Sequence, residues 1–140
     1  MERNEFLKLF GTGTLAVCAG CAIESCSSKD STNPVPAPTN VDFTLDISVA
    51  PNTSLQTAGG SVSNSGVIVA RVSTSEFTAL SQACTHQGTT VAYQPTPQNF
   101  LCPNHGSKFS TAGAVLLGPA TSPLKKYNTE LTGSNLRVFS

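Results

Sequence analysis

The chain has 140 residues, which suits one small domain with tails and is too short for two domains. Eight basic and eight acidic residues give a formal net charge of zero, so there is no basic surplus to neutralise the phosphates of a nucleic acid. With 11 Gly, 9 Pro and no Trp, the composition favours a β-rich, turn-rich domain over a helical bundle.

Residues 1–20 are predicted to form a signal peptide. A charged head is followed by an apolar run from Leu9 to Ile23, which is shorter than the ~20 residues of a membrane span but typical of a signal peptide. The head, residues 3–8, resembles the twin-arginine export pattern, with Asn4 in place of the second Arg. We therefore expect an exported bacterial protein that is located in the periplasm or the cell envelope.

Residues 21–40 are predicted to link the domain to a membrane. Ala19-Gly20-Cys21 resembles a bacterial lipoprotein cleavage box, which implies a lipid anchor on Cys21. Two alternatives remain open: an uncleaved membrane anchor, or a signal peptide that is removed without attachment of a lipid. Residues 27–40 are polar and proline-rich, a composition typical of an extended spacer.

The globular domain is expected to span residues 41–140 and to be all-β. Apolar and polar residues alternate from Val41 to Val49, which predicts a half-buried strand that ends at Pro51-Asn52. No segment has the length and periodicity of an amphipathic helix. Further strands are expected at residues 67–69, 77–80, 91–93, 99–102, 124–131 and 136–139, with the last four forming two hairpins.

The strongest functional signal is the pairing of cysteine with histidine. The chain has five Cys and two His, and each His lies within three residues of a Cys. One segment reads Cys84-Thr85-His86, and the other reads Cys102-Pro103-Asn104-His105. A glycine follows each pair, at Gly88 and Gly106, and allows a tight turn that brings backbone N–H groups close to an anion.

Three interpretations of the two Cys–His pairs compete. They could be structural, with four buried side chains or a disulfide between Cys84 and Cys102. They could bind one tetrahedral zinc ion, although zinc sites usually take two ligands of one type from a C-x-x-C or H-x-x-x-H segment. They could also divide between two metal atoms, with the thiolates on one iron and the imidazoles on the other. The double pairing has no packing reason, which favours this third interpretation.

Cys84–Gly88 and Cys102–Phe109 resemble the two cluster-binding loops of the Rieske iron–sulfur family. Gly118-Pro119-Ala120 is similar to the proline-containing third loop of that family, which shields the cluster. The resemblance covers residues 41–140 and implies an antiparallel β-sandwich with a small cluster-binding subdomain and a 2Fe–2S cofactor. The three cluster-binding loops are expected at about residues 82–90, 102–109 and 118–124.

The resemblance also implies a role for each ligand. Cys84 and Cys102 are expected to hold the inner iron, and His86 and His105 the outer, more exposed iron. Two neutral imidazoles in place of two thiolates lower the negative charge of the site, which raises the reduction potential above that of all-cysteine clusters. The residues expected to shape the loops around these ligands are Gly88, Gly106 and Pro119.

Other positions distinguish this chain within the family it resembles. Ser107 matches a serine whose hydroxyl bonds a bridging sulfide of the cluster. Phe109 stands where members of high potential have Tyr, and the missing hydroxyl is expected to lower the potential. Thr89 and Asn104 stand where respiratory members have the two Cys of a loop disulfide, so we expect a variant without that disulfide.

The resemblance implies single-electron transfer by an exported carrier that acts with redox partner proteins. No catalytic nucleophile, base or nucleotide-binding motif is present, so neither a catalytic residue nor a stand-alone enzyme is predicted. One alternative is the iron–sulfur subunit of a quinol-oxidising cytochrome bc-type complex or of a periplasmic oxidoreductase, although Gln87 replaces the apolar residue that respiratory members present to quinol. The other is a β-sandwich binding or structural module without a cluster.

Overall fold

The computed structural model describes residues 35–140, which form antiparallel strands and one short 3₁₀ helix. This architecture of β-sheets with almost no helix confirms the predicted fold class. The elements are β1 (Asp42–Asp46), the 3₁₀ helix η2 (Asn52–Gln56), β2 (Ser61–Asn64), β3 (Val67–Arg71), β4 (Phe77–Ser81), β5 (Ala92–Gln94), β6 (Asn99–Leu101), β7 (Lys108–Ser110), β8 (Val115–Leu117), β9 (Lys126–Thr132) and β10 (Asn135–Phe139).

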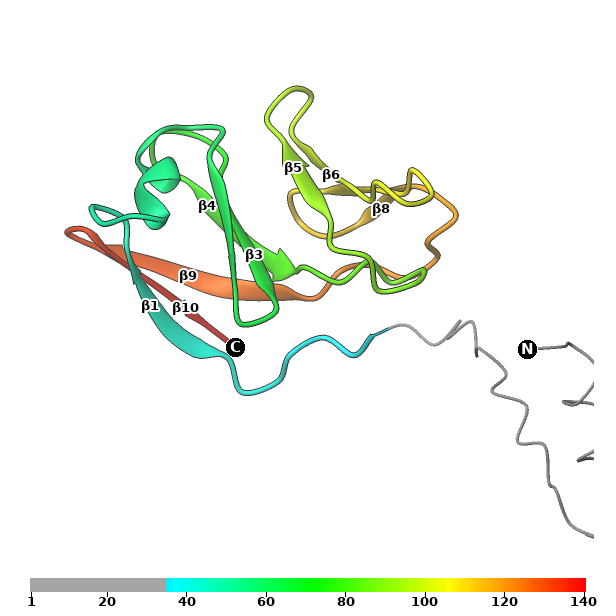
Figure 1. The fold of residues 1–140 in the computed structure, drawn as a ribbon, viewed down its shortest axis with the longest axis horizontal. Coiled ribbons are helices and arrows are strands. Elements are labelled where there is room, and N and C mark those ends of the chain that lie inside the picture. The colour runs from blue at the N-terminus through cyan, green and yellow to red at the C-terminus, as the bar shows by residue number, and fades with distance from the viewer. Residues whose placement is uncertain (1–34) are drawn as a thin grey trace, which may run out of the picture.

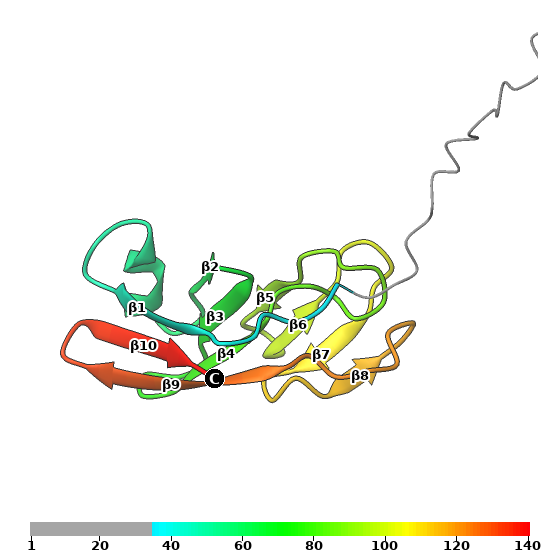
Figure 2. The same cartoon turned by 90° about the horizontal axis from the view of Figure 1, so that it is seen from below.

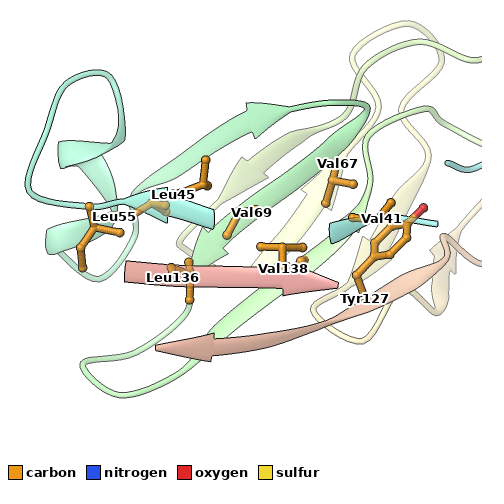
Figure 3. Close-up of a cluster of buried hydrophobic side chains, with 10 residues drawn as sticks. Val41, Leu45, Leu55, Val67, Val69, Tyr127, Leu136 and Val138 are labelled. Atoms are coloured by element: carbon orange, nitrogen blue, oxygen red, sulfur yellow. The ribbon is translucent and has the colours of Figure 1, made fainter. Parts of the chain in front are cut away.

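The larger sheet has six strands in the order β1-β10-β9-β4-β3-β2. Side chains from β1 and β10 meet side chains from β3, and a first hydrophobic core lies between them (Figure 3). Leu136 and Val138 of β10 and Leu55 of η2 are completely buried in this core. The burial of these aliphatic side chains stabilises the larger sheet as a support for the rest of the domain.

Strand β3 is buried on both faces and belongs to two cores. Val67 and Val69 lie in the first core, whereas Ile68 and Ala70 lie in the second. Successive side chains of a strand point to opposite faces, so a strand between two cores must be apolar throughout. The second core joins β3 and β4 to the smaller sheet, which has the order β5-β6-β7-β8 and forms a subdomain beside the larger one (Figure 1).

Most of the predicted strands are confirmed. The strand expected at residues 77–80 is β4, and the two expected hairpins are β5–β6 and β9–β10. The sequence pattern does not predict β2, β7 or β8, because these strands have only three or four residues each and no sustained alternation of apolar and polar residues.

The strand predicted over residues 41–49 is too long. β1 ends at Asp46, whose carboxylate accepts hydrogen bonds from the backbone N–H and the hydroxyl of Ser48 at 2.9 and 2.5 Å. The Asp46 carbonyl accepts a further bond from the N–H of Val49 at 3.3 Å. These bonds form a turn that takes the chain out of the strand. Val49 is therefore 55% exposed, although it continues the apolar alternation of the sequence.

The predictions for the N-terminal region fall mostly outside the described residues. These are the signal peptide, the lipid on Cys21 and the greater part of the spacer. Residues 35–40, the end of the predicted spacer, are described and run along the domain ahead of β1 (Figure 2). Within residues 35–140, no helix has the length and apolar character needed to cross a bilayer.

Candidate metal centre

The two Cys–His segments form loops that are near copies of each other. In the first loop, the N–H of Cys84 donates to the carbonyl of Thr89 at 2.8 Å, and the N–H of Gly88 donates to the carbonyl of Cys84 at 2.7 Å. The second loop repeats these bonds, from Cys102 to Ser107 at 2.7 Å and from Gly106 to Cys102 at 2.9 Å. Gly88 and Gly106 have φ values of 79° and 78°, which glycine adopts without steric cost.

The two cysteines lie together at the edge of the second core. Cys84 is completely buried, Cys102 is 2% exposed, and both thiols are free. Burial raises the pKa of the Cys84 thiol, and its hydrogen bond with Cys102 raises it further. The backbone N–H groups of His86 and Gln87 donate to the same sulfur and lower that pKa. The first loop therefore already directs hydrogen-bond donors at a position that suits an anionic sulfur.

The two histidines form a second pair, farther from the core. The ring centroids of His86 and His105 are 4.8 Å apart, and the rings meet edge to face at 83°. His86 is half-buried, and its Nδ1 atom is buried without a hydrogen-bond partner in the described part of the chain. His105 is exposed. A buried imidazole nitrogen without a hydrogen-bond partner is suited to ligate a metal, because a neutral imidazole offers one free lone pair.

The four predicted ligands are thus paired in space by chemical type and not by position in the sequence. Cys84 lies with Cys102, and His86 lies with His105. Within residues 35–140, no three His, Cys, Asp or Glu side chains gather closely enough to hold one ion. Two like pairs fit a centre with two metal atoms, one bound by sulfur and one by nitrogen. Because the thiols are free, the alternative of a Cys84–Cys102 disulfide is wrong.

The proline-containing third loop is tied to both ligand loops. The N–H of Ala120 donates to the hydroxyl oxygen of Ser107 at 3.0 Å, and Ala120 is buried in the second core. The hydroxyl of Thr85 donates to the carbonyl of Ser122 at 2.6 Å. Pro119 is exposed at the surface of this loop. The third loop therefore sets the position of both cluster-binding loops.

Two contacts of the site were missed by the sequence interpretation. Thr85 anchors the first loop to the third, as described above, and Asn104 Nδ2 donates to Gln87 Oε1 at 3.3 Å across the two ligand loops. The signal for Thr85 was a hydroxyl side chain at the position between the predicted ligands Cys84 and His86. Phe109 is completely buried in the second core, together with both cysteines.

Comparison with known protein families matches residues 46–128 to the Rieske [2Fe-2S] domain. The chain belongs to this family. Its cofactor is therefore a Rieske-type 2Fe–2S cluster, which fits the two like pairs of ligands in the structure.

Similar proteins include the cytochrome b6-f complex iron–sulfur subunit of Chlorobaculum thiosulfatiphilum, with 36% identity over 44% of this chain and 34% of that protein. Subunit 1 of the same name from Synechocystis sp. is 33% identical over 66% of this chain and 49% of its own length. The chain thus spans about a third to a half of the curated relatives that it matches.

A solved structure, the plasma membrane Rieske protein PetC3 from Synechocystis PCC 6803, aligns with a TM-score of 0.51 and 32% identity. The alignment covers 57% of this chain and 84% of that one. The ferredoxin of carbazole 1,9a-dioxygenase from Nocardioides aromaticivorans aligns with the same TM-score at 22% identity, which shows a shared fold alone.

Replacement of Ser107 by Ala should destabilise the iron-free domain by about 1–3 kcal/mol, because the buried N–H of Ala120 loses its acceptor. Urea unfolding followed by circular dichroism measures this change. Ser110→Ala is the matched control, since the hydroxyl of Ser110, the last residue of β7, accepts exposed bonds from the N–H groups of Ala112 and Ala114 in the turn that follows. A loss in Ser107→Ala no larger than that in Ser110→Ala would show that the Ser107–Ala120 contact does not hold the third loop.

Proposed function

We propose that this chain transfers single electrons through a cluster held by Cys84 and Cys102 on one iron and by His86 and His105 on the other. The observation that supports this ligand set most strongly is the separation of the four side chains into a buried sulfur pair and an outer imidazole pair. When bound, the cluster accepts and releases one electron at a time.

The protein residues supply the environment for this chemistry. The second core excludes water from the sulfur pair, while the exposed ring of His105 brings the other side of the site to the protein surface. An electron entering or leaving at His105 then has a short path to a partner that docks over the loops. No side chain acts as a nucleophile or base in this role.

Ser107 and Phe109 are proposed to tune the reduction potential. The Ser107 oxygen accepts the Ala120 N–H, and its own proton has no acceptor among residues 35–140, so the hydroxyl is free to donate to a cluster sulfur. Phe109 is buried beside the cysteines and has no hydroxyl to donate. Hydrogen bonds to cluster sulfur favour the more negative reduced state, so a potential below that of members with Tyr is proposed.

The loops are proposed to work without a disulfide. The positions that would pair are Thr89 and Asn104, and neither is a cysteine. The contacts available instead are the Asn104–Gln87 hydrogen bond and the bonds from Thr85 and Ser107 to the third loop. We propose that these separate contacts support the loops and that the buried Ser107–Ala120 bond contributes more than the exposed Asn104–Gln87 bond.

A second candidate is a subunit of a larger redox complex. The curated relatives with the names given above are subunits of cytochrome b6-f complexes, which favours a redox complex as the partner. In this chain Gln87 is exposed and bonded to Asn104, and it replaces the apolar residue expected to face quinol. We therefore propose an electron carrier in preference to a subunit of a quinol-oxidising complex. Co-purification with a cytochrome would favour the subunit instead.

The ligand set is tested by anaerobic preparation of the full chain, with iron and sulfide quantified and the EPR spectrum of the reduced protein recorded. The wild-type protein should contain two irons and two sulfides and show the spectrum of mixed Cys and His ligation. His105→Ala should abolish that spectrum. A colourless wild-type protein after reconstitution would support a cluster-free binding module, and one bound zinc ion would support the single-ion alternative.

We also propose that the protein is exported, cut before Cys21, and anchored by a lipid on that residue, with residues 21–40 as the spacer. Intact mass measurement of protein extracted from membranes should show the loss of the first 20 residues and the added mass of acyl chains. Cys21→Ser should abolish the added mass and release the protein from the membrane fraction. A mature chain that still begins at Met1 would contradict the proposal.

The partner is proposed to be acidic, because charge is unevenly distributed over the domain. From Phe77 to Tyr127 the chain has three lysines and no acidic residue. These lysines are Lys108, which lies in the second loop, and Lys125 and Lys126, which follow the third. The acidic residues of the described chain lie in the remainder of the domain, at Asp42, Asp46, Glu76 and Glu130. A cluster-binding half that is cationic favours encounter with an anionic surface.

Small inorganic oxidants of known charge test this distribution. Oxidation of the reduced protein by ferricyanide, an anion, should slow as ionic strength rises, whereas oxidation by a tripositive cobalt complex should accelerate. Lys108→Gln should weaken both trends, and Arg137→Gln, which removes a cation paired with Asp42 in the larger sheet, should not. Rates independent of salt, as the zero net charge alone predicts, would show that the lysines do not steer a partner.

A further inference from the structure

Residues 35–40 lie against the domain, and Pro38 makes the hydrogen bonds of this contact. The Pro38 carbonyl accepts a hydrogen bond from the Tyr127 hydroxyl at 2.7 Å and another from Lys125 Nζ at 3.4 Å. Tyr127 is only 2% exposed and belongs to the first core. The segment is thus bonded to a residue that is itself fixed by packing.

The ring of Pro38 also packs on the turn between β2 and β3. A Cβ atom placed on Gly66 would lie 2.7 Å from Pro38 Cγ, so a glycine is required for this approach. The carbonyl of Gly66 accepts the N–H of Gln82 at 3.0 Å, two residues before the ligand Cys84. The contact therefore continues toward the first cluster-binding loop.

Val35 reaches that loop directly. A Cβ atom placed on Gly88 would overlap the Cγ2 methyl of Val35 and would lie 3.3 Å from its Cβ. Gly88 is two residues beyond His86, and its N–H closes the loop on the Cys84 carbonyl. Both views of the fold show the cyan segment running from β1 to the side of these loops (Figures 1 and 2).

The second loop provides an internal comparison. Gly106 occupies the position that corresponds to Gly88, with the same pair of backbone hydrogen bonds and a φ within one degree. A Cβ atom placed on Gly106 has no neighbour within 4 Å. The two loops therefore share one backbone design, and the segment before β1 covers the first loop alone.

We propose that residues 35–40 form a strap that holds the first cluster-binding loop and thereby positions His86. Val35 and Pro38 are positioning residues, since they act through Gly88 and Gly66 and not on the cluster. This inference rests on the proposed function insofar as His86 is taken as a ligand. Because the strap is the end of the predicted spacer, displacement of the spacer is transmitted to one histidine ligand and not to the other.

The first test compares Gly88→Ala with Gly106→Ala in the full chain. Both changes place a side chain at positive φ, so this backbone cost is common to the two variants. Gly88→Ala alone forces Val35 aside, and we expect it to release the cluster about tenfold faster than Gly106→Ala, because overpacking of a fitted contact is costly. Adding Val35→Gly to each variant should bring the two release rates within about twofold of each other.

The second test leaves the sequences of both loops unchanged, so it tests the strap even if Gly88→Ala does not fold. Tyr127→Phe removes the hydroxyl that donates to Pro38, and hydrogen exchange of peptides 82–90 and 102–109 is measured by mass spectrometry on the iron-free and the loaded protein. Exchange in 82–90 should accelerate severalfold, with 102–109 unchanged. Tyr93→Phe is the matched control, because the Tyr93 hydroxyl is buried without a hydrogen-bond partner in the described chain.

The reduction potential provides a further measure of the position of His86. Loosening the strap in Val35→Gly or Tyr127→Phe should admit water at His86 and shift the reduction potential upward, since solvent exposure favours the more negative reduced state. Equal cluster release from both glycine variants, or equal exchange of both peptides in Tyr127→Phe, would overturn the strap while leaving the ligand set intact. Wild-type protein without iron and sulfide would instead overturn the proposed function, and exchange in the iron-free protein would still decide the strap.

Discussion

Two sulfur atoms held side by side at the edge of a hydrophobic core are the feature on which the site depends. Burial and the neighbouring Cys102 both raise the pKa of Cys84, so the fold resists formation of two thiolates there unless positive charge lies between them. The N–H groups directed at the Cys84 sulfur offset part of this cost. Iron bound to both sulfur atoms, as proposed above, would supply the remaining positive charge, and the buried position of the two cysteines makes that need greatest at the sulfur pair.

The architecture brings the cysteines together from two sheets. Cys84 follows β4 of the larger sheet, and Cys102 follows β6 of the smaller one. Both strands border the second core, to which the larger sheet contributes β3 and β4 and the smaller sheet contributes β6 and β7. Packing of the two sheets against each other therefore sets the distance between the sulfur atoms. A change that loosens this packing would both destabilise the subdomain and move the two sulfur atoms apart.

The features that were predictable from the sequence are those encoded locally. The two hairpins and the Cys–His segments depend on neighbouring residues, and the family resemblance supplied the order of the three loops. The end of β1 depends on a turn at Asp46 that the alternation of apolar residues does not reveal, and β7 and β8 are too short to show a pattern. The strap depends on contacts between distant residues, such as Pro38 and Tyr127, which are 89 positions apart. The pairing of cysteine with cysteine in space also depends on the fold, because in the sequence each cysteine neighbours a histidine.

The anchors of the two loops make the site asymmetric. The first loop is held by the Thr85–Ser122 bond and by Val35, whereas the second is held by the Ser107–Ala120 bond. The direct bond between the loops, from Asn104 to Gln87, is exposed and 3.3 Å long, and such bonds contribute little. The two loops are therefore coupled mainly through the third loop, to which each is hydrogen-bonded. Since His86 is half-buried beside residues 35–40 and His105 is exposed, the proposed route of the electron to a partner runs through the second loop.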